Sequence, residues 1–104
     1  MTEKELEKYL TRRCKLFGFW ALKLIILSIG GFPDRTLLMP SGRVAFCELK
    51  RDAKAKLRSN QVVMLKRLAG LGFSCYICCS KEQVDAMLKE LYDAGKNKRD
   101  NEDG

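Results

Sequence analysis

The stretch from Gly31 to Lys50 constrains the fold of this chain more than any other. Its sequence, GFPDRTLLMPSGRVAFCELK, contains two apolar segments, residues 36–39 and 43–49, separated by Pro-Ser-Gly. Short apolar segments on either side of turn-forming residues are typical of a β-hairpin. The pattern therefore predicts an antiparallel hairpin against which the other elements pack.

Three charged residues lie at one end of this predicted hairpin. If the turn is centred on Ser41, residues whose numbers add to 82 face each other, which places Asp34 opposite Glu48. Facing residues have Cβ atoms roughly 5 Å apart on one side of the sheet, and Lys50 returns to that side because side chains alternate along a strand. We therefore expect two carboxylates and an ammonium group to converge.

Two neighbouring carboxylates repel each other unless a cation lies between them. Mg²⁺ binds one or two protein carboxylates together with water and phosphate oxygens, so Asp34 and Glu48 are candidate metal ligands. Lys50 could orient or deprotonate an attacking water, or neutralise charge on a scissile phosphate. The alternative from spacing alone is an exposed hairpin end with a solvated Glu48–Lys50 pair.

Composition indicates one globular domain with a basic surface. The chain has 104 residues, of which 46% are hydrophobic and 32% charged, as in ordinary folded domains. We assign the domain to residues 1–94 and expect the polar segment 95–104 to be a disordered tail. The 20 Lys and Arg residues exceed the 13 Asp and Glu residues, giving a net charge of +7. This excess favours a polyanionic partner, and an inert basic surface is the alternative.

The sequence gives no sign of a membrane segment or of a disulfide framework. The longest apolar run, residues 24–29, is too short to cross a bilayer, and the charged N-terminus is unlike a signal peptide. The five cysteines, an odd number in apolar runs, are expected to be reduced core residues. Cys75, Cys78 and Cys79 have neither a histidine nor a second cysteine pair to complete a zinc site.

The first half of the chain predicts a helix followed by a strand. Residues 3–17 have apolar side chains at helical spacing, with Thr2 as a suitable N-cap and Gly18 as a suitable stop. Residues 19–29 are apolar apart from Lys23, so we predict a central strand that is covered on both faces.

The second half predicts a helix, a strand and a helix. Ser59 is expected to cap a helix that ends near Leu71, and residues 73–79 read as a strand. A final helix is expected over residues 80–92. The resulting order, α-β-β-β-α-β-α, indicates an α/β domain with a mixed sheet of about four strands between helices.

A basic segment follows the predicted hairpin and adjoins its charged end. It contains a single acid, Asp52, and the cations Arg51, Lys54, Lys56 and Arg58. Lys and Arg contacts to phosphate do not depend on base sequence, so this segment is a candidate DNA-binding loop. An ordinary solvated charge run is the alternative.

Two acids of the first predicted helix flank its apolar stripe. Glu3 and Glu7 both border this stripe, whereas Glu5 lies well away from it. Either Glu3 or Glu7 could therefore reach the edge of the core where the hairpin carboxylates lie. Solvated acids that favour the first turn of a helix are the alternative for each.

The order of these motifs resembles the virus-type replication-repair nuclease (VRR-NUC) family. The residues that carry the resemblance are Pro33-Asp34, Glu48-Leu49-Lys50, the basic loop and Ser59-x-Gln61, and the likeness extends from about Glu3 to Ser80. The family belongs to the PD-(D/E)XK nuclease superfamily and is similar to archaeal Holliday junction resolvases. The resemblance therefore implies a restriction-endonuclease-like core.

The resemblance implies a metal site completed by further ligands. The metal would be Mg²⁺ or Mn²⁺, and the backbone carbonyl of Leu49 would join the two hairpin carboxylates. In the superfamily a helix glutamate commonly completes the site. Glu7 is favoured because the segment from Glu7 to Lys23 is similar to the corresponding resolvase segment, and Glu3 is held in reserve because it matches the leading acid of many VRR-NUC sequences.

Other residues receive roles from the same resemblance. Gln61 would support the active site by holding Lys50 or the attacking water, and a free surface glutamine is the alternative. Lys23 would lie near the phosphates, and the alternative is a side chain that extends until its ammonium group reaches the surface. Arg35 is expected to be either a structural ion-pair partner or a contact to the nucleic-acid backbone. One departure from the family pattern is Leu27-Ser28-Ile29-Gly30, where members often have Ser-Pro-Gly, so the loop conformation there is left open.

The function predicted from the sequence is that of a metal-dependent nuclease that hydrolyses phosphodiester bonds in DNA. Related small nucleases act as dimers, so we expect a homodimer that cuts four-way junctions, flaps or similar branched DNA in replication, recombination or repair. The expected location is the cytoplasm of a bacterium or of a phage-infected host cell. The alternative is a basic nucleic-acid-binding module without catalysis, in which the carboxylates are structural.

Overall fold

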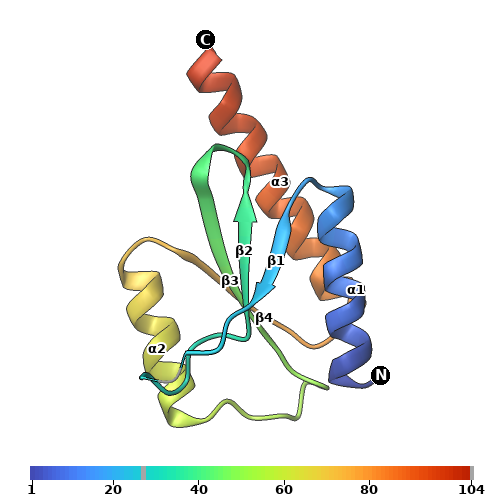
Figure 1. The fold of residues 1–104 in the computed structure, drawn as a ribbon, viewed down its shortest axis with the longest axis vertical. Helices are drawn as coiled ribbons and strands as arrows, with labels where there is room; N and C mark the ends of the chain where they lie inside the picture. The colour runs from blue at the N-terminus through green and yellow to red at the C-terminus, as the bar shows by residue number, and fades with distance from the viewer. Residues whose placement is uncertain (27, 104) are drawn as a thin grey trace.

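The chain forms a four-stranded mixed sheet with helices on both faces (Figure 1). The computed structural model describes residues 1–26 and 28–103, with side chains through Lys96. The elements in chain order are α1 (Glu3–Leu16), β1 (Trp20–Lys23), β2 (Arg35–Met39), a short 3₁₀ turn η1 (Pro40–Gly42), β3 (Arg43–Leu49), α2 (Ser59–Gly70), β4 (Ser74–Cys78) and α3 (Lys81–Asp103). The predicted fold class and element order are confirmed.

The strands follow one another in the order β1-β2-β3-β4. The first three are antiparallel, and β4 lies parallel to β3 because α2 carries the chain back along the sheet. In the β2–β3 ladder Thr36 pairs with Phe46 and Arg35 with Cys47, so facing numbers add to 82. The predicted register is confirmed, and its continuation by one residue places Asp34 opposite Glu48.

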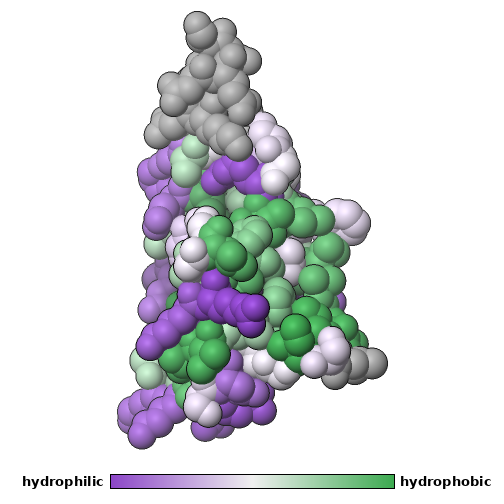
Figure 2. Space-filling view, turned by 90° about the vertical axis from the view of Figure 1, so that its left-hand side faces the viewer, coloured by the Kyte–Doolittle hydropathy of each residue, from purple (hydrophilic) through white to green (hydrophobic). Residues whose placement is uncertain are grey.

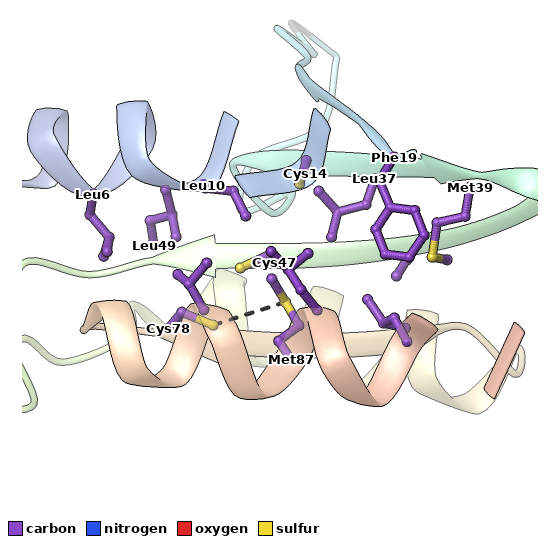
Figure 3. Packing of buried hydrophobic residues seen from close by; sticks show 14 residues of the cluster. Leu6, Leu10, Cys14, Phe19, Leu37, Met39, Cys47, Leu49, Cys78 and Met87 are labelled. Carbon is purple, nitrogen blue, oxygen red and sulfur yellow. Dashed lines mark hydrogen bonds between the residues drawn. The ribbon is translucent and has the colours of Figure 1, made fainter. Parts of the chain in front are cut away.

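One face of the sheet packs against α1 and α3 (Figure 3). Alternate side chains of β2 and β3, including Leu37 and Leu49, meet Leu10 of α1 and Met87 of α3 in a single buried cluster. Burial of each such side chain contributes about 1.5–3 kcal/mol relative to its exposure to water. This cluster holds α1 in a fixed position beside the start of β2.

The opposite face of the sheet packs against α2 and the loops beside it. Phe46 projects to this side, and its ring lies 5.3 Å from the rings of both Phe32 and Phe73. Hydrophobic and hydrophilic surface areas lie next to each other in the view of Figure 2. The exposed hydrophobic residues of α2 and β4 include Val63 and Ile77. Glu48 shares the face of Phe46, so its carboxylate points toward α2.

The predicted helix boundaries are confirmed for α1 and at the start of α3. Thr2 caps α1 by accepting a hydrogen bond from the backbone N–H of Glu5 at 3.1 Å. Gly18 follows the helix with φ of +76°, a backbone conformation that favours glycine as a helix stop. Ser80 Oγ accepts from the backbone N–H of Gln83 at 3.1 Å at the start of α3.

The prediction of a central strand over residues 19–29 was wrong. β1 contains only Trp20–Lys23 and forms one edge of the sheet, next to β2. Trp20 is 65% exposed and Ile25 is 80% exposed, whereas the side chains of a central strand would be covered on both faces. Apolar content does not distinguish an edge strand with its following loop from a buried strand. Residue 27 of the predicted strand lies outside the described residues.

Two other boundaries differ from the prediction. Ser59 is the first residue of α2 and Arg58 is its N-cap, because the Gln61 side chain accepts the hydrogen bond from the Arg58 N–H. α3 continues past Tyr92 to Asp103, so it includes residues 95–103, which we expected to be a disordered tail. This segment contains no proline, and adding one residue to an existing helix needs no new nucleation.

All five cysteines are free thiols, and Cys14, Cys47 and Cys78 are buried. The predicted role as core residues agrees with the placement of these three, whereas Cys75 and Cys79 are only half-buried. Among the helices that the structure describes, none is sufficiently long and apolar to span a lipid bilayer.

Candidate active site

Asp34 and Glu48 lie together where β2 begins and β3 ends. The backbone N–H of Asp34 donates to Glu48 Oε1 at 3.2 Å, and the backbone N–H of Leu49 donates to Asp34 Oδ2 at 3.0 Å. Each carboxylate is therefore held by the backbone of the neighbouring strand. The convergence that the register predicted is present.

The carboxylate of Glu48 is buried beside a second carboxylate. Its residue is 3% exposed, and burial raises the pKa of Glu48 above its ordinary value, as does the nearby charge of Asp34. The Lys50 ammonium group opposes this rise in the pKa. Two carboxyl groups in this arrangement favour either a bound proton or a bound cation.

Lys50 and Gln61 surround the outer oxygen of Glu48. Lys50 Nζ lies 3.5 Å from Glu48 Oε2 and 3.3 Å from Gln61 Oε1. Gln61 Nε2 donates to Glu48 Oε2 at 2.9 Å, while Gln61 Oε1 accepts from the Arg58 N–H at 2.8 Å. Gln61 is 4% exposed, so it is not a free surface residue, and it links Lys50 to the carboxylate pair.

The loop before β2 contacts the first turn of α2 through Gly31. A Cβ atom at Gly31 would lie 2.6 Å from the carbonyl carbon and oxygen of Asn60 and 2.9 Å from the backbone nitrogen of Gln61. Its φ of +82° is also a value that side chains disfavour. The sequence did not predict this contact, which places Gln61 beside the hairpin.

Glu7 points toward cations, and no contact joins it to the carboxylate pair within the described residues. Its Oε1 forms an ion pair with Arg35 and lies 3.4 Å from Lys23 Nζ. Arg35 also donates to the backbone carbonyl of Asp34 at 2.9 Å. Arg35 is 5% exposed, and burial lowers the pKa of its guanidinium. Of the two roles left open for Arg35, the structure shows the ion pair.

Both candidate helix acids border the same cavity as Asp34. This cavity has a volume of about 310 Å³, and its lining includes Glu3, Glu7, Asp34, Arg35 and Leu49. The two helix acids and the start of the hairpin therefore line one cavity, because α1 packs on the sheet beside β2.

The donor atoms of the hairpin suit a hard divalent cation. In residues 1–26 and 28–103, no three His, Cys, Asp or Glu side chains lie close enough together to hold a metal ion. Mg²⁺, however, commonly uses only one or two protein carboxylates and takes its other ligands from water and phosphate. The pair of Asp34 and Glu48 fits that requirement.

The basic loop predicted to bind DNA lies directly after β3. Asp52 Oδ1 accepts from the backbone N–H groups of Lys54 and Ala55 at 2.9 and 3.0 Å, which closes a turn. Three of the four loop cations pair with no acid in the described part of the chain, and the fourth, Arg51, lies 3.5 Å from Asp52. The four loop cations, all of them exposed, are Arg51, Lys54, Lys56 and Arg58.

Comparisons with known proteins agree with the fold and with the motifs. No family model and no curated protein matched the sequence. A solved structure of a "VRR_NUC domain" is similar over 86% of this chain and 97% of that chain, with a TM-score of 0.79 and 27% sequence identity. The resemblance to the VRR-NUC family that was predicted from the sequence is therefore confirmed, and the chain is similar to a nuclease-type domain over most of its length.

Proposed function

We propose that this protein is a metal-dependent nuclease that hydrolyses DNA phosphodiester bonds at the Asp34–Glu48 site. The observation that carries the proposal is the placement of these two carboxylates side by side, each held by a backbone N–H of the neighbouring segment, with Lys50 and Gln61 beside Glu48. A purely structural site would need only one carboxylate and one cation, because the second carboxylate adds repulsion.

Asp34 and Glu48 would hold Mg²⁺ or Mn²⁺ together with the Leu49 carbonyl. When bound, such an ion lowers the pKa of a coordinated water and neutralises charge on the scissile phosphate. Lys50 would hold the attacking water or a phosphate oxygen by its ammonium group. Gln61 would fix Lys50 and Glu48 relative to each other through its two hydrogen bonds, and it would thereby act as a positioning residue.

A helix acid is proposed to complete the metal site. Glu7 engages Arg35 and Lys23, whereas Glu3 is an exposed residue of the same cavity. The variants Glu3→Gln and Glu7→Gln separate the two. The variant that removes a metal ligand is expected to weaken Mn²⁺ binding in calorimetry, and the other is expected to leave it unchanged.

The proposed substrate is branched DNA and the proposed assembly is a homodimer. Exposed cations of the 51–58 loop would contact phosphates without reading bases, which suits recognition of DNA shape. A chain of 104 residues offers little surface for a four-way junction or a flap, and two copies would present two sites to such a substrate. Such an activity would serve replication, recombination or repair.

The experiment that tests this function is a panel of DNA substrates with and without Mg²⁺ or Mn²⁺. The panel contains a four-way junction, a flap, a linear duplex and a single strand of matched sequence. Cleavage of the branched substrates that requires metal is the expected result. Sedimentation of the protein with each DNA gives the number of chains bound, and one chain per junction would contradict the homodimer.

A second candidate function is a basic DNA-binding module without catalysis. It is favoured by the absence of a three-ligand cluster from the described part of the chain. Under this alternative, the protein binds DNA but cuts no member of the panel with either metal, and calorimetry detects no Mn²⁺ binding. Under the nuclease proposal the protein cuts branched DNA when metal is present, and calorimetry detects Mn²⁺ binding.

A further inference from the structure

A second cavity, lined mainly by basic residues, lies on the α1 side of the candidate site. Its volume is about 450 Å³ and it lies between α1 and β1, which run side by side (Figure 1). Five cations contribute to its lining, and they are Lys8, Arg12, Lys15, Lys23 and Arg35. The only acid among the described lining residues is Glu7, so the cavity carries an excess of positive charge.

The helix cations of this cavity have no acidic partners among the described residues. Lys8, Arg12 and Lys15 recur at helical spacing, which places them on one face of α1. All three are exposed, and none forms an ion pair with any residue that the structure describes. In contrast, Arg13 on the side of α1 that faces α3 pairs with Asp85 at 3.1 Å. Uncompensated cations of α1 therefore gather on its cavity side.

The cavity adjoins the smaller cavity that Asp34 lines. Glu7, Lys23 and Arg35 line both this cavity and the smaller one that contains Asp34. A polyanion that occupied the larger cavity would therefore extend toward the carboxylate pair. The 51–58 loop contributes no described residue to the lining, so this surface is separate from the predicted DNA-binding loop.

The dimensions and chemistry of the cavity favour a duplex. Lys8 and Lys15 are separated by roughly 10 Å along the helix axis, or about three base-pair steps at about 3.4 Å each. Proteins that bind single strands usually stack the bases on aromatic side chains. None of the described residues that line the cavity is aromatic. Cations without stacking rings are suited to a phosphate backbone.

We propose that the α1–β1 cavity binds the phosphate backbone of a duplex arm that extends from the cleavage site, with Lys8, Arg12 and Lys15 as its phosphate contacts. The proposal rests on the proposed nuclease function and adds a second DNA-binding surface to it. The cavity holds the arm on the α1 side, and the 51–58 loop contacts the DNA elsewhere.

The test compares two triple variants that remove the same charge. One is Lys8→Ala, Arg12→Ala and Lys15→Ala, and the other is Lys66→Ala, Arg67→Ala and Lys96→Ala. The control residues are exposed on α2 and α3, outside the cavity. Binding to a labelled duplex is measured by fluorescence anisotropy in EDTA across a salt series, and circular dichroism verifies that both variants are folded.

The slope of log K against log salt measures how many phosphates the protein neutralises. Each neutralised phosphate contributes about 0.9 to the slope, so the cavity variant is expected to lower it by up to about 2.7. That change corresponds to an affinity decrease of at most roughly 500-fold at 0.1 M salt when the affinities at 1 M are equal. The control variant is expected to keep the wild-type slope.

Equal slopes for the two variants would overturn the cavity proposal. If the cavity variant lost as much affinity for a single strand as for the duplex, the assignment of the cavity to a duplex would be overturned. Cleavage by the wild type on the same DNA tests the nuclease function separately. If only the cavity variant has a lower slope and the wild type cuts nothing in Mg²⁺ or Mn²⁺, the nuclease function is refuted and the binding surface is retained. If the wild type cuts but the two variants have equal slopes, the binding surface is refuted and the nuclease function is retained.

Discussion

The side-chain amide of Gln61 donates a hydrogen bond to Glu48 Oε2 at 2.9 Å. This contact joins the first turn of α2 to the end of β3, and the same Gln61 side chain accepts from Lys50 and from the Arg58 backbone. One buried amide therefore fixes the two charged groups to which we assign metal binding and catalysis.

Replacing Gln61 by leucine should lower cleavage without unfolding the protein. The variant keeps a similar side-chain volume but removes the donor to Glu48 and the acceptor for Lys50. Outer hydrogen-bond partners of metal sites typically change metal affinity or activity by about 10–100-fold, so we expect a loss of this size in kcat/KM, measured over a Mn²⁺ titration. A variant as active as the wild type at limiting Mn²⁺ would show that Gln61 has no positioning role.

The raised pKa of Glu48 predicts a specific pH dependence of stability. The ordinary carboxyl value is 4.5 and the folded pKa is higher, so between the two the folded protein holds a proton that the unfolded chain has released. The stabilisation from this proton is complete below pH 4.5 and disappears as the pH rises through the folded pKa. The free energy of unfolding should therefore fall with rising pH in this window.

The Glu48→Gln variant isolates this contribution. Urea unfolding is measured at a series of pH values in EDTA for the wild type and the variant. The difference between the two free energies of unfolding should change with pH above 4.5 in favour of the variant. A difference that is independent of pH would mean that Glu48 titrates alike in the folded and unfolded chains.

The close contact at Gly31 predicts a large effect of a single methyl group. In Gly31→Ala, the positive φ costs about 1–2 kcal/mol, and displacement of the Asn60 backbone adds about 1–3 kcal/mol. Gly18→Ala is the matched control, because its φ is +76° but no described atom lies within 4 Å of the position that a Cβ would occupy. Chemical denaturation should show a greater loss of stability at Gly31, and equal losses would contradict the contact with α2.

Thr36 offers a site where stability should increase. Its Oγ1 is buried and has no hydrogen-bond partner among the described residues, and the residue is 6% exposed. Thr36→Val removes this unsatisfied hydroxyl at nearly constant volume, so we expect a gain of about 1 kcal/mol in the free energy of unfolding. Thr11→Val is the control, since Thr11 donates to the Glu7 carbonyl. A destabilised Thr36→Val protein would refute the prediction.

The hairpin could be predicted from the sequence because its information is local. The turn at Ser41 fixes which residues face each other, and strand alternation then assigns Glu48 and Lys50 to one side. The residues outside the hairpin that contact Glu48 could not be predicted in this way. The burial of Gln61 depends on the packing of α2 against Gly31, and this contact joins segments that are far apart in the chain.

The errors also have physical causes. The run from Phe19 contains enough apolar residues for a central strand, but position in a sheet is decided by which strands pair, and β2 has β3 on its other side. The ion pair between Glu7 and Arg35 depends on the rotation of α1 about its axis. Helical spacing identified both Glu3 and Glu7 as flanking residues, but the spacing does not specify which cation each one meets.

The most direct test of the Asp34–Glu48 site is metal-dependent cleavage by Asp34→Asn. An asparagine oxygen can still accept the hydrogen bond from the Leu49 N–H, so the variant should fold while one negative charge is removed. Cleavage of a labelled four-way junction in Mn²⁺ is measured beside DNA affinity in EDTA. We predict a rate loss of more than about 100-fold, since outer hydrogen-bond partners alone account for about 10–100-fold, with DNA affinity retained. Cleavage at the wild-type rate by the folded variant would contradict the proposed site.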